Sequence, residues 1–74
     1  MPHIDVKYFP RELSHEEKEA IADELCAVIQ KHFQSKETSL SVTMAEVAKD
    51  NWKSSVYDQI IDSPDLIKKP GYQM

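Results

Sequence analysis

The sequence predicts an α/β chain, a β-α-β unit with C-terminal short helices and a sheet completed by dimerisation. Two short segments alternate apolar and polar residues, and a long amphipathic segment with helical spacing separates them. With 74 residues, the chain is too short to bury a large core by itself. We expect a single domain over residues 1–74.

The first strand is predicted from His3 to Phe9. Its residues alternate between an apolar and a polar side, with Ile4, Val6 and Tyr8 opposed to His3, Asp5 and Lys7. Pro10 ends the strand, because proline cannot donate to a ladder and restricts the residue before it. Pro2 therefore stands at the free end of a strand.

A helix is predicted from Ser14 to Gln34. Ser14 and Glu17 have the spacing of a capping box, which satisfies free backbone N–H groups at a helix start. Apolar residues then recur at the helical period, among them Ile21, Leu25, Val28 and Ile29.

A second strand is predicted from Thr38 to Glu46, with Leu40, Val42 and Met44 on its apolar side. A strand, a crossover helix and a second strand favour parallel pairing. Beyond Val47, helical spacing predicts one helix that is broken near Ser63, and the tail after residue 67 is typical of a turn.

A lone pair of parallel strands leaves one face and both edges of its sheet uncovered. Pairing of two copies solves both problems, so we expect a homodimer, in preference to a hexamer. One cysteine, Cys26, cannot form an internal disulfide, and no Cys/His cluster has the spacing of a zinc site. Association is the remaining way to stabilise so short a chain.

The composition indicates a globular cytoplasmic protein. Hydrophobic residues make up 41% of the chain and charged residues 30%. No stretch predicts membrane insertion or secretion. A net charge of −4 without a basic stripe argues against a nucleic-acid partner.

Pro2 is the residue with the most distinctive chemistry. If Met1 is removed, the Pro2 nitrogen becomes a free secondary amine. A free α-amino group titrates near pH 8, and an apolar pocket or a nearby cation lowers that pKa towards neutrality. Such a group suits general-base catalysis.

Several segments occur together in an order and spacing that resemble the 4-oxalocrotonate tautomerase superfamily. They are residues 2–6, 10–14, 16–18, 38–42 and 46–52, and the resemblance extends over nearly the whole chain. The closing segment Leu66-Ile67-Lys68-Lys69-Pro70-Gly71-Tyr72 resembles that of the dimeric PptA-type branch.

This resemblance implies a cofactor-free keto–enol tautomerase in which Pro2 is the general base and acid. Arg11 matches a family arginine and is expected to bind a substrate carboxylate, which a guanidinium does bidentately. Ser41 stands where the family carries a second arginine, so the resemblance implies enols of small 2-oxo monocarboxylates, such as phenylenolpyruvate. Trp52 matches an aromatic pocket wall, although a lone tryptophan also fills dimer cores.

Two alternatives remain open from the sequence. The chain is then either a non-catalytic homo-oligomeric interaction module, or a hydratase or dehalogenase of the same superfamily that uses the same proline. The state of Met1 separates enzyme from module, because an intact Met1–Pro2 amide has no basic nitrogen. No metal or cofactor is implied by any of these interpretations.

Overall fold

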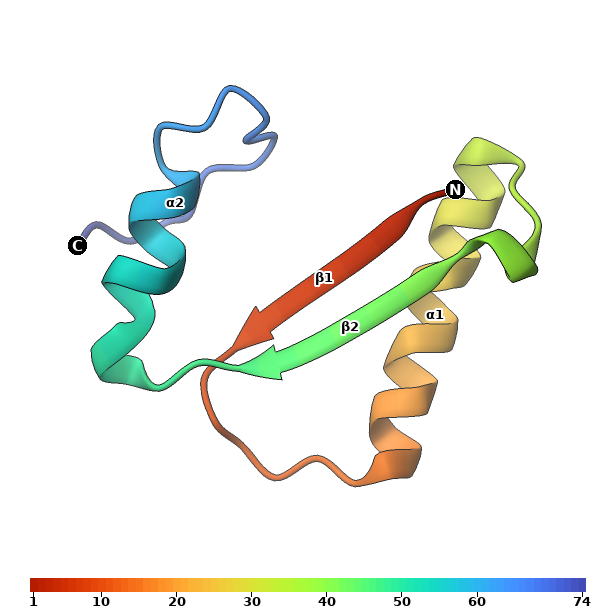
Figure 1. Cartoon of the computed structure of the whole chain (residues 1–74), viewed down its shortest axis with the longest axis horizontal. Helices are drawn as coiled ribbons and strands as arrows, with labels where there is room; N and C mark the ends of the chain where they lie inside the picture. The colour runs from red at the N-terminus through yellow and green to blue at the C-terminus, as the bar shows by residue number, and fades with distance from the viewer.

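Two parallel strands and the helix that joins them form the centre of the fold. The structure, a computed structural model, describes all residues 1–74. The β-α-β unit consists of β1 (His3–Tyr8), α1 (His15–Phe33) and β2 (Ser41–Glu46). Both arrows in Figure 1 point away from the N-terminus and toward the side of the molecule that carries the C-terminal segment. The predicted β-α-β unit with C-terminal short helices is therefore confirmed.

The strands pair in register from His3 opposite Ser41 to Tyr8 opposite Glu46. The pairing continues one residue further, since the Val47 N–H donates to the Tyr8 carbonyl at 2.8 Å. Exposed and half-buried residues alternate along β1, as the period-two pattern predicts. The polar residues of both strands lie on the open face of the sheet.

The second strand begins three residues later than the sequence pattern predicts. Glu37–Ser39 form a short 3₁₀ turn, η1, before β2 begins. The Ser39 hydroxyl donates to the Lys36 carbonyl at 2.8 Å, and the Ser39 N–H donates to the same carbonyl at 3.0 Å. A serine side chain that bonds to nearby backbone favours a turn over a strand, and this local preference shortens β2.

The helix α1 has the boundaries that its sequence predicts. Ser14 caps its start, where Glu17 N–H donates to the Ser14 hydroxyl at 3.1 Å and Ser14 N–H donates to the Glu17 carboxylate at 3.2 Å. At the other end, Gln34 adopts a left-handed conformation with φ of 55°. The Ser14 cap thus fixes the residue at which the loop after β1 ends and α1 begins.

After β2, three short helical turns of different kinds replace the single helix that the sequence predicts. They are the 3₁₀ turn η2 (Lys49–Asn51), the π-helical turn η3 (Lys53–Tyr57) and α2 (Asp58–Ile60). They succeed one another without a gap wider than one residue, so the predicted helical segment is present but irregular.

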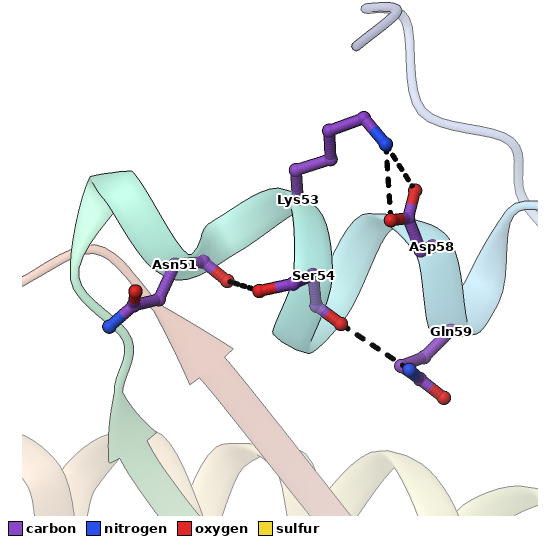
Figure 2. A network of polar contacts seen from close by, with 5 residues as sticks. All are labelled: Asn51, Lys53, Ser54, Asp58 and Gln59. Atoms are coloured by element: carbon purple, nitrogen blue, oxygen red, sulfur yellow. Dashed lines mark hydrogen bonds and ion pairs between the residues drawn. The ribbon is translucent and has the colours of Figure 1, made fainter.

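Side chains five residues apart meet across η3, as Figure 2 shows. Lys53 Nζ donates to both oxygens of Asp58, at 3.0 and 3.1 Å, and Gln59 Nε2 donates to the Ser54 carbonyl at 3.3 Å. The Ser54 hydroxyl in turn donates to the Asn51 carbonyl at 3.3 Å. A separation of five residues suits a π turn, whose backbone bonds also join residues five apart.

The single chain has almost no interior. Only Val56 and Tyr57 are buried, both in η3. The radius of gyration is 14.0 Å, whereas a compact chain of this length is expected near about 11 Å. No helix combines the length and the apolar character that crossing a membrane requires.

Candidate active site

Pro2 lies at the amino end of the sheet, immediately before β1. It is half-buried and continues the alternation that also half-buries Ile4 and Val6. Met1 is fully exposed. With Met1 removed, the Pro2 nitrogen would stand at the rim of the sheet, held in place by the paired strand that follows it.

Ser41 lies at the same end of the sheet, opposite His3. Its hydroxyl oxygen is 2.7 Å from Nδ1 of His3. On the other side of the ring, His3 Nε2 lies 3.3 Å from Thr43 Oγ1. Ser41 is therefore part of a polar row on the open face of the sheet, and it is adjacent to the strand that carries Pro2.

The polar row continues through Asp5 to Lys7. The Thr43 hydroxyl donates to Asp5 at 2.9 Å, and Lys7 Nζ donates to the other oxygen of the same carboxylate. These hydrogen bonds, first from Lys7 and then from Thr43, lower the pKa of Asp5 from its ordinary value. Asp5 is therefore a charged carboxylate at neutral pH.

A groove of about 580 Å³ opens at the opposite, carboxyl end of β1. Five of its seven lining residues are hydrophobic, which is typical of a small-molecule site with a few polar groups. The lining residues are Lys7, Tyr8, Phe9, Arg11, Trp52, Tyr72 and Met74. Two of the predicted site residues, Arg11 and Trp52, therefore share one groove.

Aromatic rings fix the wall of this groove. The ring of Trp52 meets the ring of Phe9 edge to face, with centroids 5.0 Å apart and an interplanar angle of 88°. Trp52 Nε1 donates a hydrogen bond of 2.8 Å to the Tyr72 hydroxyl. The Tyr72 ring also lies 5.7 Å from the ring of the buried Tyr57. The indole of Trp52 is thus held between two segments. Tyr72 of the C-terminal tail contacts it on one side, and Phe9, directly after β1, contacts it on the other.

Arg11 supplies an unpaired positive charge in this groove. It lies in the loop between β1 and α1, is exposed, and makes no ion pair in the chain. It also borders a second groove, of about 600 Å³, beside Glu12 and Glu46. A free guanidinium next to an apolar aromatic wall can bind the carboxylate of an aryl or alkyl acid.

Within one chain, the predicted site residues form two separate groups. Pro2 and Ser41 lie at the amino end of the strands, and Arg11 and Trp52 lie beyond the carboxyl end of β1. A strand of six residues separates the groups by about 20 Å. Figure 1 shows the same separation between the N-terminus and the C-terminal segment.

Sequence reasoning did not include Lys7, Tyr8, Phe9, Tyr72 or Met74 in the site, although all five line the groove. Lys7 was visible only as one polar residue of an alternating strand. Tyr72 lies in a turn-like tail, and no local pattern indicates that the tail returns to Trp52. No group of three or more His, Cys, Asp or Glu side chains is placed to hold a metal ion.

Comparison with known proteins identifies the family. Residues 2–56 match the family described as tautomerase enzyme. The chain belongs to the tautomerase family. It is therefore an enzyme of the isomerase type, and the resemblance seen in the sequence is confirmed.

Three curated relatives of this tautomerase cover essentially its full length, and all are called tautomerase PptA. The relative from Pectobacterium carotovorum subsp. carotovorum (strain PC1) is 58% identical over 74 residues, 97% of each chain. The relative from Cronobacter sakazakii (strain ATCC BAA-894) is 57% identical over 76 residues, covering all of both chains. That from Escherichia coli (strain SMS-3-5 / SECEC) is 41% identical over 75 residues, again over all of both chains.

Proposed function

We propose that this tautomerase interconverts the enol and keto forms of small 2-oxo acids without a cofactor, with monocarboxylates such as phenylenolpyruvate as substrates. The observation that carries the proposal is the groove in which an unpaired Arg11 faces an aromatic wall around Trp52. Arg11 binds the substrate carboxylate, and the wall packs against the substituent of the enol.

Pro2 is the general base and acid in this proposal, after removal of Met1. Its amine takes the proton of the enol hydroxyl, the oxygen lone pair forms the carbonyl, and the carbon–carbon double bond takes the proton back at the neighbouring carbon. Atoms and electrons balance within the substrate and one amine, so the step needs no oxidant or reductant. The positive charge of Arg11 stabilises the enolate that develops between the two proton transfers.

The site is proposed to form between two protomers of a homodimer. Pro2 and the Arg11 groove lie at opposite ends of one sheet, so Pro2 of one protomer meets Arg11 and Trp52 of its partner. The open sheet edges and the near absence of buried residues support association. Ser41 is proposed to border the same site from the Pro2 side, where it adds no charge.

Residues 1–74 act as one domain in the cytoplasm, and the partners are a second copy and a small substrate, with no nucleic acid or membrane. The net charge of −4 supports the exclusion of nucleic acid.

The catalytic proposal is tested by following the enol absorbance of phenylenolpyruvate with purified enzyme. We expect the rate to depend on one basic group that titrates near neutral pH, at about pH 7. Pro2→Ala should lower kcat/KM by about 10²- to 10⁴-fold, the range for loss of a general base. Intact-mass spectrometry should show that Met1 is absent from the active protein.

Three results would reject this proposal. Undiminished activity of Pro2→Ala would exclude the amine as the base. Full activity of protein that retains Met1 would exclude it as well, because the Pro2 nitrogen is then an amide. If the wild-type enzyme instead hydrates or dehalogenates its substrates through Pro2, the catalytic role of Pro2 stands but the proposed keto–enol reaction is rejected.

A further inference from the structure

Two cationic side chains, not one, line the groove at the end of β1. Lys7 borders it together with Arg11 and Trp52. Lys7 also borders a neighbouring groove that Asp5 lines. Two cations in one apolar groove would suit a substrate with two carboxylates, so the number of free charges determines what the groove accepts.

The two cations differ in their partners. Lys7 Nζ is bound to the Asp5 carboxylate, two residues earlier on the same face of β1. Arg11 has no carboxylate partner. The positive charge of Lys7 is therefore paired with a carboxylate, whereas the positive charge of Arg11 is not.

Asp5 is held in place for this pairing. Its second oxygen accepts the Thr43 hydroxyl from β2, and the same hydroxyl approaches His3. The lowered pKa of Asp5 keeps its carboxylate ionised well below neutral pH. Lys7 therefore meets an ionised carboxylate that the Thr43 hydroxyl anchors to β2.

We propose that Asp5 is a specificity-determining residue, which restricts the groove to monocarboxylates by occupying Lys7. The inference deepens the proposed function and rests on it. A second substrate carboxylate must displace Asp5 from Lys7, which is disfavoured because Asp5 is already in contact. Loss of the Asp5 charge frees Lys7 for that second carboxylate.

The expected change in substrate preference is small, because the ion pair between Lys7 and Asp5 is partly exposed to solvent. The side chains of Lys7 and Asp5 are 40% and 43% exposed, so solvent screens their interaction. We expect the ratio of affinities for a dicarboxylate and a matched monocarboxylate to change by roughly fivefold, the upper end for exposed ion pairs.

The test is a fluorescence titration of the full-length protein, in which Trp52 is the only tryptophan and lines the groove. Phenylacetate is the monocarboxylate probe, and 4-carboxyphenylacetate is the dicarboxylate probe. Asp5→Asn keeps the shape of the side chain and should raise the affinity ratio in favour of the dicarboxylate by roughly fivefold. Asp5→Asn combined with Lys7→Gln should return the ratio to the wild-type value.

Asp58→Asn is the matched control. Asp58 also pairs with a lysine, Lys53, and its neutralisation changes the net charge by the same amount. It does not line the groove, so the affinity ratio should stay at the wild-type value. Asp5→Ser provides a second neutral variant, with the same expected gain, in case the amide of Asp5→Asn perturbs the sheet.

An unchanged ratio in the folded neutral variants would overturn the inference, as would a gain that survives the loss of Lys7. An equal gain in Asp58→Asn would attribute the effect to net charge alone and would also overturn it. The titration needs no turnover, so its failure is distinguishable from that of the proposed reaction. Inactive wild-type enzyme with the expected titration would reject the reaction and leave the groove assignment standing.

Discussion

At the scale of single residues, the groove depends on contacts that converge on one indole. Trp52 meets Phe9 edge to face and donates its N–H to Tyr72. An indole N–H has one hydrogen to donate, and in apolar surroundings the folded state is destabilised when that N–H has no acceptor. Tyr72 therefore orients the ring against which we propose the substrate packs.

Tyr72→Phe should loosen this orientation while the ring itself is kept. The loss of one neutral hydrogen bond should raise KM for phenylenolpyruvate by roughly fivefold with a smaller change in kcat. Trp52 emission should become more accessible to acrylamide quenching. Tyr57→Phe is the control, because its ring lies beside Tyr72 but outside the groove. Equal quenching in both variants and in the wild type would refute the positioning role of Tyr72.

At the scale of elements, local signals predicted structure well wherever one segment contains the whole signal. The Ser14–Glu17 capping box lies within four residues, and it fixes the start of α1 as predicted. The start of β2 was misplaced because Ser39 bonds to the preceding backbone, and alternation continues through such a turn. The π turn η3 was missed because the Lys53–Asp58 spacing carries no common sequence signal.

Ser14→Ala should destabilise the protein by about 1 kcal/mol, the usual effect of removing a helix N-cap. The measurement is urea unfolding at one fixed protein concentration, because the proposed association would make apparent stability depend on concentration. Thr38→Ala, an exposed hydroxyl outside any cap, should change stability by less than about 0.5 kcal/mol. A loss in Thr38→Ala as large as in Ser14→Ala would show that the cap has no special effect.

At the scale of the whole molecule, the single chain is open and has almost no interior. Two buried residues and a radius of gyration of 14.0 Å describe an open shape. Exposed large apolar side chains, including Phe9, Phe33 and Ile67, remain to be covered. These exposed side chains support the association that we propose.

The candidate site was predictable from the sequence only in part, because it depends on contacts between segments that are distant in the chain. The residue types at Pro2, Arg11, Ser41 and Trp52 indicate their chemistry, but their distribution over two ends of the sheet depends on how the elements are arranged. Lys7 and Tyr72 enter the groove through contacts between distant segments. Alternation and helical spacing describe neighbours along the chain and contain no information on such contacts.

Subunit complementation tests the central claim, a proline-based site shared between protomers, most directly. Pro2→Ala and Arg11→Ala should each be nearly inactive as pure proteins. When the two are unfolded, mixed in equal amounts and refolded, half of the dimers should be mixed, and each should hold one intact site. The account predicts recovery of about a quarter of wild-type activity on phenylenolpyruvate. A mixture that stays as inactive as its two components would contradict it.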